Sequence, residues 1–405
     1  MQSYILANET PGVNDSQSLS LAIRKAKQTG VNRVLIPKHN QRTGGDLWEI
    51  TETVRLPDDI ELIFDNAHLR LADGVYGNMF ANQNLGTLLG QTPAGEQRNI
   101  TLRGIGSAVL DGGRYNGLSE RSCSKEGLPH ISVNTTLFFF NVRGLTVENL
   151  NLTNQRWWAI TNVFVREAAF RNLAFRADLS RIDAAGVHYP GERPRNYEET
   201  YVKNADGIDL RIGCHDILIE NITGFTEDDT VALTALGGFE RRLGYWVEGA
   251  DADIHDVRIR HIASDPYACS VVRLLNDNGY KLYNIDIEGI THLRTQTDFS
   301  QTASTVRIGD MAYAENHSEL GDTFGITIKN VVSHAVYAVS LCKGLKDSRI
   351  ENIFVAEGGR YGFAGLPNGG AVMENCEIRN IAAVSPDAVP VCFENVEQRC
   401  ESANG

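Results

Sequence analysis

Residues 145–175 read LTVENLNLTNQRWWAITNVFVREAAFRNLAF and contain one short phrase twice. In each copy an apolar residue and a polar residue precede an Asn, and another apolar residue follows it. The two copies centre on Asn149 and Asn172, which lie 23 residues apart. The phrase recurs toward the C-terminus, and the full series is Asn149, Asn172, Asn221, His261 (a variant), Asn284, Asn330, Asn352 and Asn380.

Four of the seven intervals in this series lie close to 23 residues or to twice that number. A fixed period of this length predicts stacked coils made of short strands. Each coil of such a solenoid buries its apolar positions only by stacking on its neighbours. We therefore expect an all-β chain, built as a single-stranded parallel β-helix that forms one domain over residues 1–405.

The recurring Asn has a structural and a functional interpretation. Stacked Asn side chains can hydrogen-bond one another and the turn backbone along a solenoid, whereas a ligand-binding Asn would have to face a cleft. We favour the structural role, because the Asn recurs in almost every coil.

Residues 1–37 are expected to form an N-terminal cap helix and the first strand, VNRVLIP. Asp15 or Ser16 can cap this helix, and Gly30 can end it. An apolar stripe at helical spacing supports the helix, and its members are Leu19, Ala22, Ile23 and Ala26. A lone helix at the start of a solenoid would shield the first coil from edge pairing.

Two polar stretches interrupt the period, at residues 178–203 and 292–325. Insertions in solenoids gather on one face, which is often the binding face. We expect 178–203 to be an inserted loop near the active site.

The net charge of −13 argues against nucleic acid as a partner and gives no sign of binding to a membrane surface. No signal peptide is visible at the N-terminus, which favours a cytoplasmic protein, or a secreted one if a signal has been removed. The seven cysteines are odd in number and show no CxxC spacing, so we expect reduced thiols.

Two acidic phrases stand out, NADGIDL at 204–210 and TEDDTVAL at 226–233. Asp206 and Asp228 lie 22 residues apart, which is one coil of the period, so we expect Asp206 beside Asp228 with Asp229 next to them. Crowded carboxylates raise the pKa of at least one member, and a glycosidase needs one protonated and one ionised carboxyl group. A solvated acidic turn and a calcium site are the alternatives.

These phrases resemble the NTD and DD motifs of the polygalacturonases, glycoside hydrolase family 28, which are also about 22 residues apart. The phrases SAVLDGGRYNG and LPHISVNTTLFFFNVRGLTVENLNLTNQRWWAIT resemble the segments that precede the NTD motif in that family. The motifs that resemble those of the family lie within residues 100–290. The expected architecture resembles that of the family over about residues 10–390. It implies the right-handed parallel β-helix of the pectin-lyase-like group.

Carried over residue by residue, the resemblance implies a role for each acidic residue. Asp228 would be the general acid that protonates the leaving oxygen, and Asp206 and Asp229 would hold and deprotonate the attacking water. Asn204 would orient this cluster, and Asp209 would be a structural turn residue. The implied mechanism inverts configuration and needs no cofactor or metal.

The chain departs from the family at two further motifs. No GHG phrase follows, and Tyr245 or Asp251 is expected in place of its His. Arg273 matches the Arg of the RIK motif, while Leu275 replaces the Lys that helps to bind galacturonate, and Arg307 is a weaker alternative for the Arg.

Aromatic and loop residues complete the predicted site. Trp157 and Trp158 are candidates for stacking on sugar, and consecutive strand residues point to opposite faces, so one of them is expected to be exposed. His188 in the inserted loop is a candidate for a pocket wall, together with Tyr189, Arg193 and Arg195.

We expect a glycosidase that cleaves an α-linked pectic or related oligosaccharide, and the inserted loop favours exo-action. A polysaccharide lyase or epimerase on the same fold is one alternative. A non-catalytic carbohydrate-binding solenoid is another.

Overall fold

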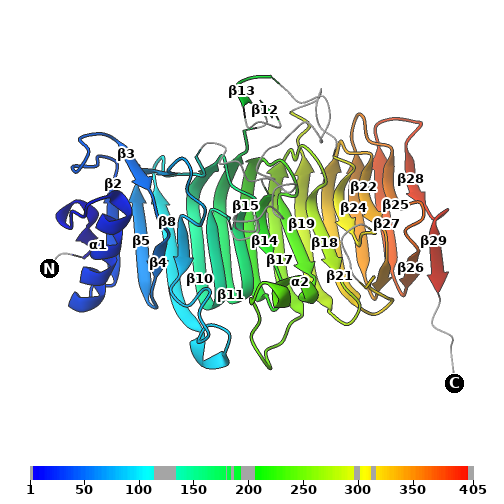
Figure 1. Ribbon diagram of the computed structural model, residues 1–405. Coiled ribbons are helices and arrows are strands. Elements are labelled where there is room, and N and C mark those ends of the chain that lie inside the picture. The colour runs from blue at the N-terminus through cyan, green and yellow to red at the C-terminus, as the bar shows by residue number, and fades with distance from the viewer. Residues whose placement is uncertain are drawn as a thin grey trace. The chain divides into compact units, whose positions relative to one another are not determined.

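The computed structural model describes residues 3–113, 134–178, 180–183, 187–192, 206–295, 302–311 and 316–399. The chain divides into two compact units, unit 1 (Met1–Ile208) and unit 2 (Asp209–Gly405). In both units short strands pair in parallel with strands of neighbouring coils (Figure 1). The fold is the predicted right-handed parallel β-helix.

Unit 1 is held together by rows of apolar side chains that run from coil to coil. One row crosses β2 (Arg33–Pro37), β5 (Ile60–Asp65), β8 (Gln97–Ile105), β10 (Leu137–Thr153) and β11 (Trp158–Arg176). Strand register aligns its buried members, which are Val34, Leu62, Leu102, Val147 and Phe170. Shorter strands β3 (Leu47–Ile50), β4 (Val54–Leu56), β6 (His68–Leu71), β7 (Phe80–Asn82) and β9 (Val109–Asp111) build the other faces.

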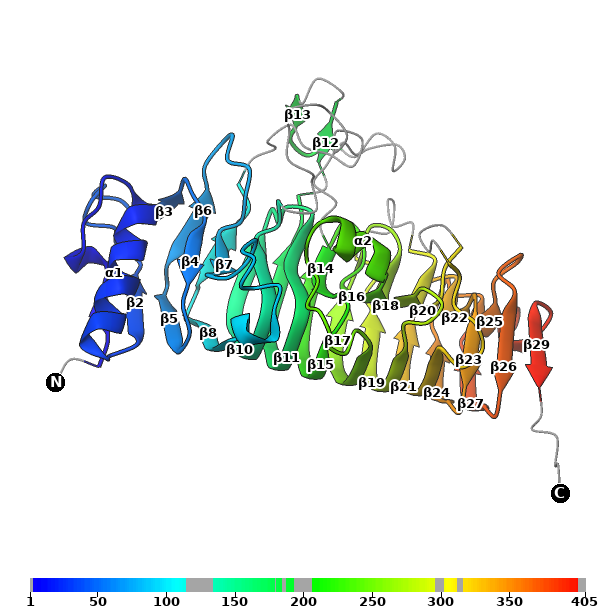
Figure 2. The same ribbon diagram turned by 60° about the horizontal axis from the view of Figure 1, so that its bottom comes forward.

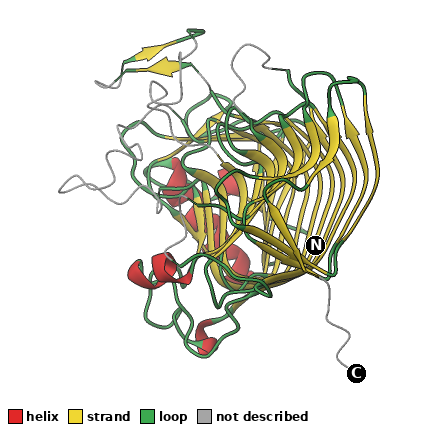
Figure 3. Ribbon diagram, turned by 90° about the vertical axis from the view of Figure 1, so that its right-hand side faces the viewer, coloured by secondary structure: helices red, strands yellow, loops and turns green. Residues whose placement is uncertain are grey.

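Unit 2 repeats this arrangement in β15 (His215–Phe225), β17 (Ile254–Ser264), β19 (Leu282–His292), β21 (Thr323–Ser333), β24 (Arg349–Val355) and β27 (Glu377–Ala383). These strands lie side by side in that order (Figure 2). The aligned row consists of isoleucines, and its members are Ile219, Ile259, Ile287, Ile328, Ile350 and Ile378. In an end-on view the strands of neighbouring coils overlie one another, as stacking of aligned coils requires (Figure 3).

A second face of unit 2 carries the chemistry described below. It consists of β16 (Val231–Ala235), β18 (Ser270–Asn276), β20 (Ser304–Ile308), β22 (Tyr337–Leu341), β25 (Tyr361–Gly365) and β28 (Val389–Cys392). β20 lies inside the stretch 292–325 that we predicted to be a polar excursion, so that prediction is wrong for these five residues. The sequence STVRI is too short to show a strand period, yet four of its five residues are buried against the neighbouring coils.

The repeated Asn is structural, as predicted. Asn172 donates a side-chain hydrogen bond to Asn149 at 2.8 Å, and Asn352 donates one to Asn330 at 3.1 Å. These residues have a left-handed backbone with φ between 53° and 58°, which Asn tolerates better than most residues. The Asn therefore serves both as the bend residue of each coil and as a bond to the next coil.

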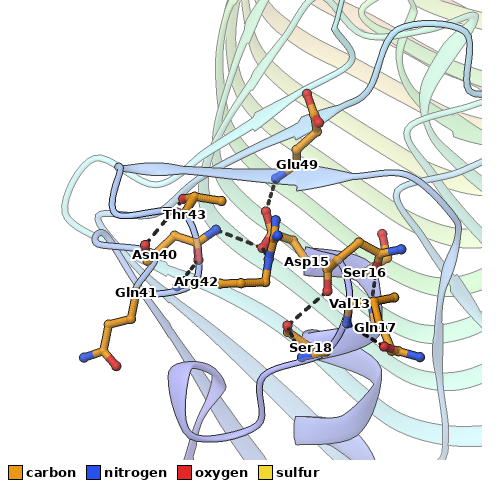
Figure 4. Close-up of polar contacts among 12 residues, drawn as sticks. Val13, Asp15, Ser16, Gln17, Ser18, Asn40, Gln41, Arg42, Thr43 and Glu49 are labelled. Atoms are coloured by element: carbon orange, nitrogen blue, oxygen red, sulfur yellow. Dashed lines mark hydrogen bonds and ion pairs between the residues drawn. The ribbon is translucent and has the colours of Figure 1, made fainter.

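The helix α1 (Asp15–Thr29) has the predicted buried stripe, and Gly30 ends it in the left-handed conformation. Its cap was predicted wrongly: Asn14 is the N-cap residue, and its side chain accepts a hydrogen bond from Gln17 N at 2.8 Å. Asp15 is fully buried and accepts hydrogen bonds from Asn40, Arg42 and the backbone of Glu49 (Figure 4). Because these bonds use both of its carboxylate oxygens, Asp15 ties the helix to β3 and does not cap it.

Three smaller features complete the description of the fold. In the inserted stretch the structure describes an antiparallel pair, β12 (Arg181–Ile182) and β13 (His188–Tyr189), which forms a separate two-stranded sheet. Cysteines with free thiols are Cys214, Cys269, Cys342, Cys376 and Cys392. Among the described residues, no helix combines the length and the apolar character that crossing a bilayer requires.

Candidate active site

Asp228 and Asp229 lie in the turn between β15 and β16 of unit 2. Thr226 Oγ1 donates a hydrogen bond to the backbone oxygen of Asp228 at 2.7 Å, and Tyr267 N donates one to Thr226 O at 2.9 Å. The following strand, Val231–Ala235, is buried at every position. A rigid turn backed by the next coil therefore holds the two carboxyl groups side by side.

The carboxyl group of Asp229 meets a guanidinium from the next coil. Arg273 Nη1 donates to Asp229 Oδ2 at 3.2 Å, and Arg273 Nη2 pairs with Asp310 Oδ2. Arg307 Nη2 also reaches Asp310 Oδ2, at 3.0 Å. These side chains alternate in sign and come from three successive turns of the solenoid, so they form one buried charge network.

Burial raises the pKa of Asp229 to about 7, and the charge of Asp228 acts in the same direction. The guanidinium of Arg273 opposes this rise but does not cancel it. The side chain of Asp229 is only 2% exposed, and its Oδ1 atom has no hydrogen-bond partner among the described residues. Asp229 therefore holds a proton near neutral pH, and Asp228 lies beside it in the same turn.

Arg273 stays protonated in this environment. Burial by itself lowers the pKa of its guanidinium, but the neighbouring acidic groups, with Asp229 first and then Asp310, raise it above the ordinary value. Arg273 is therefore a fixed positive charge and a poor candidate for a general base.

Cys269 is a site residue that the sequence did not indicate. Its turn pairs with the acidic turn, since Ala268 N donates to Glu227 O at 2.9 Å. Burial first, and then Asp228 and Asp229, raise the pKa of the Cys269 thiol well above its ordinary value, so the thiol stays protonated. The 18 residues between β16 and β17, which include the short helix α2 (Gly237–Arg242), lengthen this coil and hid the alignment of Cys269 with Asp228.

Asp310 is the second residue that sequence reasoning missed. It follows the strand of Arg307, which the sequence offered only as a weaker alternative to Arg273. The structure brings both arginines together, because Arg273 and Arg307 are register partners on β18 and β20. Leu275 is buried on the same strand as Arg273.

Asp206 and Asp228 belong to different units, so their predicted proximity stays a prediction. Asp206 begins β14 (Asp206–Leu210), and its backbone N donates to Trp157 O at 2.9 Å within unit 1. Asp209, predicted to be structural, is buried in unit 2. Asn204, Arg193 and Arg195 lie outside the described residues.

The prediction that one of the two tryptophans is exposed was wrong, since both are buried with ring centroids 5.4 Å apart. Trp157 has φ of 50° and precedes β11, so the alternation of side chains along a strand does not apply to it. Their contact with a sugar stays a prediction.

The other predicted binding residues have local partners. His188 pairs with Asp178 at 2.9 Å in unit 1, and Asp251 pairs with His255 at 3.4 Å in unit 2. Tyr245 lies after α2, where its backbone N donates to Glu240 O at 2.9 Å. Cys269 aligns with Asp228, because the register of β16 and β18 pairs Val231 with Val272.

Among the described residues, one group has potential ligand atoms close enough together to hold a metal ion. It consists of Asp228, Asp229 and Cys269, whose ligand atoms lie within 4.8 Å of one another. Calcium prefers six to eight oxygen ligands, so two carboxylates and a thiol suit it poorly. The adjacent guanidinium of Arg273 further disfavours a cation. The acid–base interpretation of the pair fits these residues better than the calcium alternative.

Comparison with known proteins supports the fold. No protein-family model matches the chain, and no curated protein matches its sequence. A solved polygalacturonase from Erwinia carotovora is similar with a TM-score of 0.60 and 13% identity, covering 96% of this chain and 94% of that one. An exopolygalacturonase from Thermotoga maritima has a TM-score of 0.55 and 16% identity, covering 98% and 91%.

A tailspike protein of E. coli bacteriophage HK620, solved in complex with a hexasaccharide, is also similar. Its TM-score is 0.62 at 13% identity, and the match covers 98% of this chain and 64% of that one. At such identities the similarity shows the fold alone. The resemblance to the polygalacturonases seen in the sequence therefore extends to the architecture of the whole chain.

Proposed function

We propose that this chain is a glycoside hydrolase that cleaves an α-linked pectic or related oligosaccharide with inversion of configuration. The observation that carries the proposal is the Asp228–Asp229 pair, in which Asp229 has a pKa raised to about 7. Paired carboxyl groups of unequal proton affinity are the machinery that glycosidases require. Similarity in fold to solved polygalacturonases supports the choice of a pectic substrate.

In this proposal the pair acts as one unit that carries a single proton up to about neutral pH. Asp229 is the more deeply buried member and is held by Arg273, whereas Asp228 is the more exposed and delivers the proton to the leaving oxygen. Burial gives Asp229 the high proton affinity, so in this proposal Asp229 is the proton reservoir of the pair.

The attacking water requires a further carboxylate in this mechanism. Donor atoms of Asp228 and Asp229 lie within 4.8 Å, which is shorter than the roughly 6.5–9.5 Å that an inverting enzyme needs for a water between its two carboxyl groups. We therefore assign the activation of water to Asp206, with Asn204 orienting it. Exo-action is part of the proposal and rests on the inserted stretch 178–203.

A lyase or epimerase would need a base that removes a proton from carbon. Arg273 was the candidate for this base, and its raised pKa keeps it protonated. This observation favours hydrolysis over elimination.

The first experiment is the substitution Asp228→Asn, with hydrolysis of pectic and neutral oligosaccharides followed by release of reducing ends. We expect kcat to fall by about 10²- to 10⁴-fold, the usual contribution of a positioned acid–base group. Asp286→Asn is the matched control. Asp286 lies on β19, pairs with Arg260 and Lys329 of the two neighbouring strands, and belongs to no proposed site. An unchanged kcat in Asp228→Asn would remove this residue from the mechanism.

Proton NMR of the newly released anomer tests the stereochemistry directly. We expect the first product to be the β-anomer from an α-linked substrate. An α-anomer would instead indicate retention, which requires carboxyl groups about 5 Å apart and would make one of the pair a nucleophile. Analysis of product length in the same samples tests exo-action, which predicts monosaccharide or a single short product from the start.

A binding-only solenoid is the second candidate, and the near-complete burial of both carboxyl groups favours it. It predicts measurable affinity for oligosaccharides without turnover of any of them, in wild type as in Asp228→Asn.

A further inference from the structure

Two arginines of unit 2 stand next to each other on neighbouring coils. Arg273 on β18 and Arg307 on β20 are register partners in parallel strands, which stack about 4.8 Å apart. Two like charges at this spacing repel strongly unless carboxylates compensate them. The two guanidinium groups therefore need a negative charge between them.

The chain supplies its own carboxylate. Asp310 Oδ2 accepts a hydrogen bond from Arg273 Nη2 and forms an ion pair with Arg307 Nη2 at 3.0 Å. Its other oxygen, Oδ1, accepts a hydrogen bond from Met311 N at 2.6 Å. The second terminal nitrogen of Arg273 meets Asp229 at 3.2 Å. Both ends of the Arg273 guanidinium are therefore occupied by protein carboxylates, and Asp310 is fixed at both of its oxygens.

We propose that Asp310 is a built-in counterion that takes the position an acidic substrate group would need, so that the sugar beside Arg273 carries no free carboxylate. This inference rests on the proposed function and names its substrate class: a neutral sugar, or a uronate whose carboxyl group is esterified.

The physical reason is the balance of charge beside Arg273. Guanidinium groups recognise a carboxylate best through two parallel hydrogen bonds, and each terminal nitrogen of Arg273 already has a protein carboxylate as a partner, Asp229 or Asp310. A substrate carboxylate entering here would also face the negative charge of Asp310. Such a repulsive element discriminates against the charged ligand as effectively as a new contact favours the neutral one.

One more cation follows this face of the solenoid. Lys343 comes after β22, the coil beyond Arg307, and its side chain is half-buried next to Gly309. With coils about 4.8 Å apart, Lys343 lies three coils, or about 14 Å, along the solenoid from the Asp228 turn. An acidic group near Lys343 would belong to a different sugar of the chain, so the test needs ligands with a single sugar ring.

The probes are three glycosides that differ only at carbon 6: 4-nitrophenyl α-D-galactopyranoside, the corresponding galacturonide, and the methyl ester of that galacturonide. Binding is measured by calorimetry on Asp228→Asn, so that turnover does not interfere. We expect the neutral glycoside and the ester to bind at least tenfold more tightly than the free acid. This comparison needs no change at Asp310.

The double variant Asp228→Asn/Asp310→Asn then tests the assigned residue. Asn is similar in shape but uncharged, so we expect affinity for the free acid to rise at least tenfold while affinity for the neutral glycoside changes less than threefold. The double variant Asp228→Asn/Asp286→Asn is the control and should leave all three affinities unchanged. Tight binding of the free acid to Asp228→Asn, or no gain in the Asp310 variant once circular dichroism has shown that it is folded, overturns the inference.

Activity separates failure of this inference from failure of the proposed function. A wild-type chain that cleaves the galacturonide but not the neutral glycoside contradicts the role of Asp310 and leaves hydrolysis standing. A chain that neither binds nor cleaves any of the three glycosides, nor longer pectic oligosaccharides, contradicts the proposed function and this inference with it.

Discussion

At the scale of single residues, the burial of Asp229 dominates the electrostatics of the site. A carboxyl group in water ionises near pH 3.9, but burial raises the pKa of Asp229 to about 7 even though Arg273 donates a hydrogen bond to it. Loss of hydration therefore outweighs the attraction of the guanidinium. The site maintains a proton in the folded state at a pH where the unfolded chain has released it.

This difference predicts how stability depends on pH. Because the folded state binds the proton more tightly, the contribution of Asp229 to stability is complete below about pH 4 and is lost as the pH rises through about 7. Asp229→Asn cannot ionise, so we expect it to exceed the wild type at pH 8 by about 1–3 kcal/mol, with the difference shrinking toward pH 4. Urea unfolding at several pH values measures this.

Asp286→Asn, which changes a partly exposed aspartate outside the proposed site, again serves as the control and is measured at the same pH values. An Asp229→Asn variant that is less stable than wild type at pH 8 would contradict the assigned proton affinity. The expected gain in stability would accompany a loss of activity, the trade-off common to residues kept for function.

At the scale of the secondary-structure element, the Asn bend links neighbouring coils. Asn352 donates to Asn330 and accepts from Asn380 at 3.2 Å, so it takes part in two bonds of the ladder. Its φ of 57° is a conformation that most side chains avoid. The residue thus contributes both a backbone bend and cross-coil hydrogen bonds.

Two substitutions at Asn352 separate these contributions. Asn352→Gly keeps the bend but removes the bonds, so we expect a loss of about 1–2 kcal/mol in the free energy of unfolding. Asn352→Ala also forces a Cβ-bearing residue without a polar side chain into the left-handed region, and we expect a further loss of about 1 kcal/mol. Chemical denaturation measures both, and equal stability of the two variants would contradict a conformational role for Asn.

At the scale of the whole molecule, stability is a sum of neighbouring coils. Ile287 is completely buried between Ile259 and Ile328, while Ile378 occupies the same row in the last coil and is only half-buried. In a solenoid each repeat contacts only the adjacent repeats, so a destabilising substitution in one coil should affect mainly that coil and its neighbours.

We expect Ile287→Ala to lower the free energy of unfolding by about 2–5 kcal/mol, as large-to-small changes in a packed core do. Ile378→Ala is the matched control and should cost less than half as much. Hydrogen exchange should show the greatest loss of protection in β17, β19 and β21. A uniform loss over all of unit 2 would indicate that its coils unfold as one cooperative body.

Much of the architecture could be predicted because the repeat is local information. The Asn period and the stripe of α1 both follow from side chains that must meet at fixed spacing, and the Asp228–Asp229 pair is contiguous in the chain. By contrast, the cap residue Asn14, the strand around Arg307 and the role of Asp310 depend on contacts between segments tens of residues apart. No periodic signal marks them.

The sequence by itself determined that strands would stack in parallel coils and that a pair of adjacent carboxyl groups would end one of them. Only the tertiary structure decided which charges surround that pair, because coils of unequal length set the register between them. The 41 residues from Asp228 to Cys269 span the same single step along the solenoid that 23 residues span elsewhere. A longer loop raises the number of residues per coil without changing the strand pairing. Separation along the chain therefore does not reveal which side chains become neighbours.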